Sequence, residues 1–250
     1  MVVKMFKKIL SLSNPYIKQI VKIRKEKKFR ESEKKALLIG KNAIDDLKDL
    51  IEIDTLIITD EALAKEYRSS NVLLVSESIM KKITNVVSPE KIACVIKIEK
   101  REIKEKNRIL ILDNVSDPGN MGTIIRTAYG FGFDLVIVSK NSTDPFSEKS
   151  LRASKGTIFL MPILVLSIDD ILSFIRENKI NTYLADLAGD DIDKIKFITP
   201  FAIILSNEAL GASDWTKKNS TKFTIPLKNN LDSLNVATAG SICMYLAGKS

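Results

Sequence analysis

The stretch LILDNVSDPGNMGTIIRTAYGFGFDLVIVS, residues 110–139, decides how the chain folds. An apolar run of strand length, Ile109 to Leu112, opens it, and a second apolar run closes it. Between the two runs, Asp117 suits a helix N-cap and Pro118 suits the first helical turn. The stretch therefore predicts a strand, a loop, a helix and a second strand.

Arg126 lies in the middle of this predicted helix. Ile124, Ala128 and Phe131 share one helix face, and Arg126 projects away from that face. One interpretation is a solvated surface arginine, since charged residues are usually exposed. The other is a functional arginine, and spacing alone leaves both interpretations open.

Two later stretches repeat the order of apolar strand, polar or glycine-containing loop, and helix. They are IILSNEALGAS at 203–213 and IPLKNNLDSLNVATAGSICMYLA at 225–247. The ordered triplet DPGNMGTIIRTA, NEALG and IP…SLNVATA resembles the three motifs of the SPOUT superfamily. Within that superfamily it resembles the SpoU/TrmH branch of RNA ribose 2′-O-methyltransferases. The resemblance covers residues 106–250.

Strands alternate with helices throughout residues 106–250, which predicts an α/β domain with a mostly parallel sheet. The resemblance implies that this is a SPOUT domain whose C-terminal segment is threaded into a trefoil knot, an exception to the general rule against knots. It also implies a homodimer whose interface lies close to the final helix and the cofactor.

Shorter alternations between residues 36 and 98 predict a second, smaller α/β domain, residues 1–105. The segment KIRKEKKFRESEKKALLIGKNAIDDL resembles the opening of the L30e/L7Ae-like substrate-binding domain that precedes the catalytic domain in many SpoU-type enzymes. Family members often carry Glu-Gly where this chain has Ile39-Gly40. The charged segment 97–107 is typical of a linker.

The net charge of +8 is concentrated near the N-terminus, where residues 4–35 hold twelve Lys and Arg against three Glu. A helix is predicted from Asn14-Pro15 to about Phe29. Its basic residues either form a solvated surface or contact RNA phosphates. Because few acidic residues are interspersed, we favour RNA contacts by Lys22, Arg24, Lys25, Lys27, Lys28 and Arg30.

Several classes of site are excluded by composition. The chain has no histidine, which excludes a histidine base, a Ser-His-Asp triad and a His-ligated metal. Its two cysteines, Cys94 and Cys243, support neither a disulfide framework nor a zinc cluster. No apolar run is long enough to span a membrane and no signal-peptide pattern is present, so we expect a cytoplasmic protein without a membrane partner.

The resemblance implies S-adenosylmethionine (AdoMet) as the methyl donor and no metal. Methyl transfer to a 2′-hydroxyl needs the oxygen, methyl and sulfur in line, and a group that takes up the proton. Arg126 matches the central catalytic arginine of motif one. A guanidinium is always protonated, so it either needs special activation or acts by stabilising charge and orienting phosphate. The other matching catalytic positions are Asn120, Glu208, Ser233 and Asn235.

Family members bind AdoMet in a bent form, largely through backbone groups of the knot loops. The matching positions here are Leu205, Ser206, Asn207, Gly211, Ile225, Pro226, Leu227 and Leu234. Ser206 stands where a glycine is common.

We therefore expect an AdoMet-dependent RNA 2′-O-methyltransferase. The separate basic domain favours 23S-type ribosomal RNA over transfer RNA as its substrate. Three alternatives remain: a non-catalytic RNA-binding or ribosome-assembly protein on the same fold, a SPOUT enzyme that methylates a base, and another α/β nucleotide-binding enzyme. The intact catalytic positions disfavour a non-catalytic RNA-binding protein. The SLNVA-type third motif disfavours a base methyltransferase, and the absence of phosphate-loop motifs disfavours another nucleotide-binding enzyme.

Overall fold

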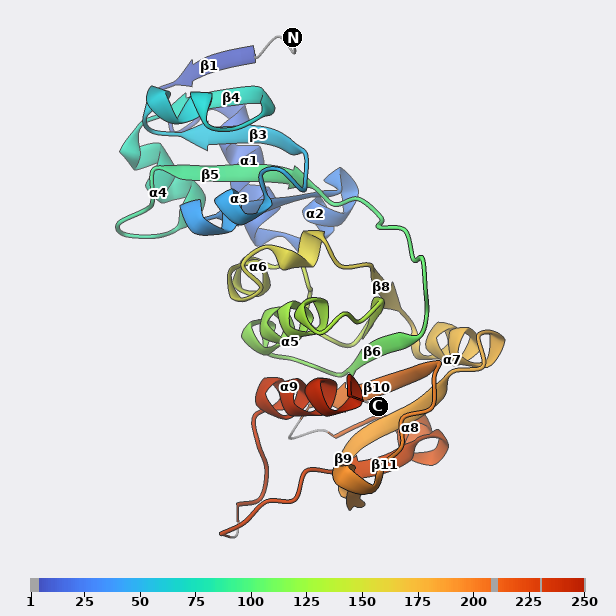
Figure 1. The fold of residues 1–250 in the computed structure, drawn as a ribbon. Coiled ribbons are helices and arrows are strands. Elements are labelled where there is room, and N and C mark those ends of the chain that lie inside the picture. The colour runs from blue at the N-terminus through green and yellow to red at the C-terminus, as the bar shows by residue number, and fades with distance from the viewer. Residues whose placement is uncertain (1–4, 208–210, 230, 250) are drawn as a thin grey trace. The chain divides into compact units, whose positions relative to one another are not determined.

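A computed structural model describes residues 5–207, 211–229 and 231–249 (Figure 1). The chain divides into two compact units. The N-terminal unit comprises Met1–Glu99 and Phe146–Leu160, and the C-terminal unit comprises Lys100–Pro145 and Met161–Ser250. A later segment of the chain, residues 146–160, thus packs with the N-terminal unit. Among the described residues, no helix is long and apolar enough to cross a membrane.

The N-terminal unit is built on a five-stranded sheet with the order β1-β4-β3-β5-β2. β1, β4 and β3 are parallel, whereas β5 is antiparallel to both of its neighbours. The strands are β1 (Met5–Ile9), β2 (Lys35–Ile39), β3 (Ile53–Ile58), β4 (Ser69–Val75) and β5 (Ile92–Lys97). The helices are α1 (Pro15–Lys25), α2 (Lys27–Glu33), α3 (Lys41–Leu47), α4 (Glu77–Thr84) and α6 (Glu148–Ala153), with 3₁₀ turns η1 (Glu61–Lys65) and η2 (Thr157–Phe159).

Successive strand residues point to opposite faces of this sheet, and each face is covered. Leu37 faces a core formed with α1 and α4, to which Ile20 and Met80 belong. Its neighbour Leu38 faces the segment after α6, because a Cβ added at Gly156 would lie 3.2 Å from the Leu38 side chain. The segment from the second half of the chain therefore completes the core of the N-terminal unit.

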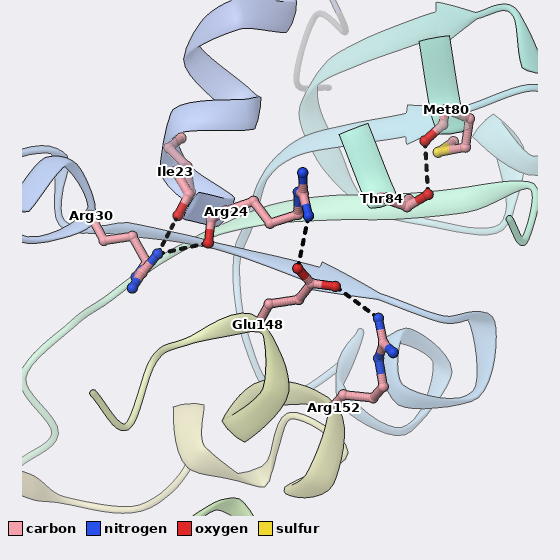
Figure 2. A network of polar contacts seen from close by, with 7 residues as sticks. All are labelled: Ile23, Arg24, Arg30, Met80, Thr84, Glu148 and Arg152. Carbon is pink, nitrogen blue, oxygen red and sulfur yellow. Dashed lines mark hydrogen bonds and ion pairs between the residues drawn. The ribbon is translucent and has the colours of Figure 1, made fainter. Parts of the chain in front are cut away.

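The basic helix is shorter than predicted. α1 ends at Lys25 because Glu26 is extended (φ −108°, ψ 110°), and α2 starts anew at Lys27. The Arg30 guanidinium donates from Nη1 to the carbonyl oxygens of Ile23 (2.9 Å) and Arg24 (2.8 Å), as Figure 2 shows. Arg30 thereby satisfies carbonyls that the helix end leaves without intrahelical partners.

Three further elements differ from the sequence-based expectation, and one of them is a strand that was not predicted. The alternating pattern of residues 36–98 predicts a helix around residues 62–68, where the structure has only the 3₁₀ turn η1, and the edge strand β1 was not predicted. The final helix begins at Val236 rather than near Ser233. The remaining predicted strands and helices of both halves are present, with ends shifted by a few residues.

The C-terminal unit contains a six-stranded sheet with the order β11-β9-β10-β6-β7-β8, in which every pair is parallel. This confirms the predicted parallel α/β domain. The strands are β6 (Arg108–Asp113), β7 (Leu135–Ser139), β8 (Ile163–Leu166), β9 (Asn181–Asp191), β10 (Phe201–Ser206) and β11 (Thr221–Thr224). The helices are α5 (Pro118–Gly130), α7 (Ile168–Glu177), α8 (Asp214–Asn219) and α9 (Val236–Ala247), with the 3₁₀ turn η3 (Ile192–Lys194).

Helices cover both faces of this sheet. α7 contributes Ile171 to the core on one face, together with Ile111 and Ile204. α9 lies beside α5 and β10 (Figure 1). Its approach to β10 depends on a glycine, since a Cβ at Gly240 would lie 2.5 Å from Leu205 Cδ1. This contact fixes α9 against the strand that leads into the second sequence motif.

Candidate active site

The first two sequence motifs follow strands that are neighbours in the sheet. β6 and β10 are parallel neighbours, and Asp113 at the end of β6 pairs with Ser206 at the end of β10. In open parallel sheets, ligands bind outside the carboxyl ends of the strands. The loops that follow these two strands therefore form the expected position of a site.

A buried carboxylate ties these loops together. Asp113 is fully buried, and its Oδ2 accepts hydrogen bonds from Ser213 N (2.9 Å), Ser213 Oγ (2.7 Å) and Thr216 Oγ1 (3.0 Å). Asp113 Oδ1 is also buried and has no hydrogen-bond partner within the described ranges. Sequence reasoning did not single out Asp113, although an acidic residue directly after an apolar strand was the available signal.

The described ends of the second motif, Asn207 and Gly211, are held to each other, and Asn207 is anchored to the first motif. Gly211 has φ +68°, which favours glycine, and its N–H donates to the Asn207 carbonyl oxygen (2.8 Å). The Asn207 side chain donates from Nδ2 to Ser116 Oγ at 2.6 Å. Glu208, a predicted catalytic residue, lies outside the described residues.

Asn120 and Asn235, two predicted catalytic residues, meet across the first and third motifs. Asn235 Nδ2 donates to Asn120 Oδ1 at 3.1 Å. Asn235 is also the N-cap of α9, with its Oδ1 accepting from Ala237 N at 3.0 Å. The sequence allows either Ser233 or Asn235 to cap the final helix, and Ser233 is exposed in the preceding loop. The cap position therefore belongs to Asn235 and not to Ser233.

A pocket of about 320 Å³ opens beside the ends of β10 and β11. Seven of the eight predicted cofactor positions line it, and Pro226, which is exposed, does not. Ser233 also lines the pocket. The other lining residues, which sequence reasoning missed, are Ala185, Asp186, Leu187, Ala212, Lys217, Phe223, Thr224, Val236 and Ala239.

Two opposite charges, Asp186 and Lys217, line this otherwise largely apolar pocket. Asp186 Oδ2 lies 3.7 Å from Lys222 Nζ, and Asp186 Oδ1 accepts from Ala188 N at 2.9 Å. The nearby Cys243 on α9 is no alternative base or nucleophile, because burial raises the pKa of its thiol to about 12. Within the described ranges, no cluster of acidic or cysteine side chains could hold a metal ion.

Arg126 lies on the exposed side of α5. It forms no hydrogen bond or ion pair with the described part of the chain, and it does not line the pocket. The face of α5 beside it is held to α9 by Thr127 Oγ1 and Ser241 Oγ, 3.4 Å apart, and by the rings of Phe131 and Tyr245. The structure thus joins Asn120 to Asn235 but leaves the Arg126 guanidinium free of partners in the described chain.

The predicted RNA-binding residues separate into two groups. Lys22, Lys25, Lys27 and Lys28 are exposed. Arg24 is only 8% exposed, and its Nη1 contacts Glu148 Oε2 on α6 at 3.0 Å (Figure 2). Arg30 is 5% exposed and caps α1. The structure corrects the expectation for these two arginines, since both guanidinium groups are buried against protein partners.

Comparison with known proteins agrees with the sequence motifs. Residues 107–245, more than half of the chain, match the SpoU rRNA Methylase family. The chain belongs to this family. Residues 14–94 match a domain described as MRM3-like substrate binding domain. The sequence-based prediction of a SpoU/TrmH-type methyltransferase with an N-terminal substrate-binding domain is confirmed.

Some relatives of this SpoU methylase match nearly its whole length. It is 28% identical over 244 residues to a Bacillus subtilis 23S rRNA (guanosine(2553)-2′-O)-methyltransferase, RlmP, covering 96% of this chain and 98% of the relative. The crystal structure of an AdoMet-bound rRNA methyltransferase from Sinorhizobium meliloti has a TM-score of 0.87 at 29% identity, covering 98% of both chains. A Streptomyces viridochromogenes SpoU methyltransferase, AviRb, shares the fold, with a TM-score of 0.82 at 21% identity over 94% of this chain and 97% of that one.

Proposed function

We propose that this protein transfers a methyl group from AdoMet to a ribose 2′-hydroxyl of ribosomal RNA. The observation that carries the proposal is the pocket beside β10 and β11, which adjoins the second and third motifs of a SpoU-family chain. When bound, AdoMet supplies a methyl group activated by a sulfonium. The rest of the chemistry belongs to the side chains of the protein.

The chemistry of the pocket fits AdoMet. Its volume of about 320 Å³ is at the lower end of the roughly 300–1,000 Å³ typical of small-molecule sites. Leu205, Phe223 and Leu234 provide apolar surface for an adenine ring. Asp186 and Lys217 carry the charges that complement the ammonium and carboxylate of a methionine moiety.

The proposed roles of the catalytic residues follow from their chemistry. Arg126 carries a permanent positive charge on a guanidinium that has no partner among the described residues, so it orients RNA phosphate and stabilises negative charge developing on the ribose oxygen. Unless Arg126 is specially activated, the proton needs another acceptor. Asn120 and Asn235 hold each other through one hydrogen bond and position ribose or phosphate. Glu208 and Ser233 remain proposed organisers of the site.

Each of the two domains expected from the sequence has its own proposed role. Residues 1–105 bind the RNA, with the exposed lysines Lys22, Lys25, Lys27 and Lys28 meeting phosphates, and residues 106–250 carry out methyl transfer. Relatives named as ribosomal RNA methyltransferases support ribosomal over transfer RNA. The trefoil knot and a homodimer with its interface near α9 are proposed from the family resemblance. The cytoplasmic location is proposed from the sequence.

The experiment compares two pools of substrate. Unmodified ribosomal RNA and unmodified transfer RNA are each incubated with the protein and methyl-labelled AdoMet. We expect label in the ribosomal pool at a rate well above that in the transfer pool. Label confined to transfer RNA would show that transfer RNA is the substrate instead. The proposal would be contradicted if the protein bound AdoMet but methylated neither RNA pool, whether the RNA was free or part of an assembly intermediate.

A further inference from the structure

The N-terminal unit has a second pocket, of about 120 Å³, that methyl transfer does not use. It lies where α1 and α2 meet the sheet. Ile20, Ile23 and Val95 form a buried apolar floor. The other lining residues are Tyr16, Gln19, Phe29, Glu33, Lys35, Asp54, Thr55 and Asn71.

Two aromatic rings flanked by cations border this pocket. Tyr16 on α1 is 50% exposed, and Lys7 Nζ lies 5.3 Å from its ring centroid. Phe29 on α2 is half-buried, and Lys22 Nζ lies 5.6 Å from its ring centroid. Because each ammonium lies over one face of its ring, a planar base would stack on the opposite face and have two positive charges close by for its phosphate backbone.

Several polar groups of the pocket have free hydrogen-bonding capacity. The side chains of Gln19 and Glu33 form no hydrogen bond or ion pair with the described residues. Asn71 uses Nδ2 to donate to the Asp54 carbonyl oxygen at 3.0 Å, which leaves its own Oδ1 as an acceptor. By contrast, Lys35 and Asp54 neutralise each other at 3.0 Å. The free groups are two amides and one carboxylate, which can read the edge of a ligand.

We infer that this pocket holds one unpaired nucleobase of the RNA substrate, stacked on Tyr16 with its N–H edge at Glu33. Unpaired bases are recognised by aromatic stacking combined with hydrogen bonds to their edges. The volume of about 120 Å³ is several times the roughly 30 Å³ that one water occupies, which is room for a base but not for a duplex. The inference rests on the proposed function in taking RNA as the substrate.

The test measures binding of the full-length protein to short single-stranded RNA homopolymers of each base by fluorescence anisotropy. Tyr16→Ala should lower affinity at least about fivefold through lost stacking, and Gln19→Ala should lower it by less. Since neither change removes a cation, the slope of log affinity against log salt should stay the same. Glu33→Gln should shift the preference among the bases, because a carboxylate accepts N–H donors and an amide both donates and accepts.

Matched controls separate the pocket from general effects. Phe6→Ala removes an exposed aromatic outside the pocket, and Glu61→Gln makes the same charge change on η1. Neither should alter stacking or base preference. The inference would be overturned if the pocket variants kept the RNA affinity and the base preference of the wild type. It would also be overturned if these variants lost binding of free nucleoside monophosphates but kept their affinity for RNA. Methyl transfer by the wild type is measured separately. It tests the proposed function whatever the outcome for the pocket.

Discussion

At the scale of single residues, Asp113 is the strongest structural anchor of the site. Its carboxylate accepts three hydrogen bonds from the start of α8, so Asp113→Ala leaves the half-buried Ser213 N–H without its acceptor, together with one of the two neighbouring hydroxyls of Ser213 and Thr216. We expect unfolding free energy to fall by about 1–3 kcal/mol and AdoMet binding to weaken, measured by urea unfolding and calorimetry. Asp113→Asn, which can keep one acceptor, should lose less, and Asp214→Ala is the exposed control. Unaltered AdoMet affinity in Asp113→Ala would remove its positioning role.

Arg126 is free of protein partners in the described chain, which distinguishes it from the buried Arg24 and Arg30. Arg126→Ala should reduce methyl transfer about 100- to 1,000-fold, because it removes the positive charge proposed to stabilise the reacting ribose oxygen, while thermal stability and AdoMet affinity stay near wild type. Arg126→Lys should recover little, since an ammonium lacks the bidentate fork. Arg176→Ala on α7 is the exposed control. Wild-type turnover by Arg126→Ala would show that Arg126 has no central role in methyl transfer.

At the scale of elements, the sequence predicted those with strong periodicity. The central strands β6, β7 and β10 of the C-terminal unit are mainly apolar runs, as in LVIVS at Leu135–Ser139, and parallel packing between helices favours that pattern. The break at Glu26 could not be predicted, because the basic residues continue across it without Gly or Pro. β1 was missed because MFKKI holds two lysines, which suit an edge strand but do not identify one.

The helix α6 illustrates what a local pattern cannot show. The pattern predicts a helix around Glu148, yet this residue also binds the buried Arg24, which lies 124 residues earlier, and the exposed Arg152 on its own helix (Figure 2). Glu148→Ala should lower unfolding free energy by about 1.5–3 kcal/mol because it leaves a buried guanidinium without its carboxylate. Arg152→Ala should change it by only about 0.2–1 kcal/mol. Urea unfolding compares the two, and equal effects would show that Arg24 does not depend on Glu148.

At the scale of the whole molecule, the motifs predicted the family, and they also brought seven of the predicted cofactor positions together in one pocket. Seven predicted positions line that pocket because the motifs follow parallel strands whose ends share one edge of the sheet. Asp186 and Lys217 were not predicted, since their positions depend on how β9 and α8 lie beside β10. The membership of residues 146–160 in the N-terminal unit was likewise invisible, because it depends on contacts distant in sequence.

The uneven charge of the molecule makes a prediction about RNA binding. Lys25, Lys27 and Lys28 are exposed, and Lys27 has only a loose contact with Glu31 at 3.9 Å. Changing all three to Ala should weaken binding and reduce the salt slope by about one for each phosphate that is no longer neutralised. Lys179, Lys194 and Lys196 changed together serve as the control with the same loss of charge. If the N-terminal triple variant kept the wild-type slope of log affinity against log salt, these lysines would not contact phosphate.

The central claim is that the methyl group goes to a ribose oxygen. The most direct measurement is alkaline digestion of ribosomal RNA labelled by the protein from AdoMet, followed by separation of the products. A 2′-O-methyl group blocks cleavage at its own phosphodiester, because the 2′-oxygen can no longer attack. We predict label in alkali-resistant dinucleotides, and its loss with Arg126→Ala. Label in ordinary mononucleotides would place the methyl group on a base and contradict the account.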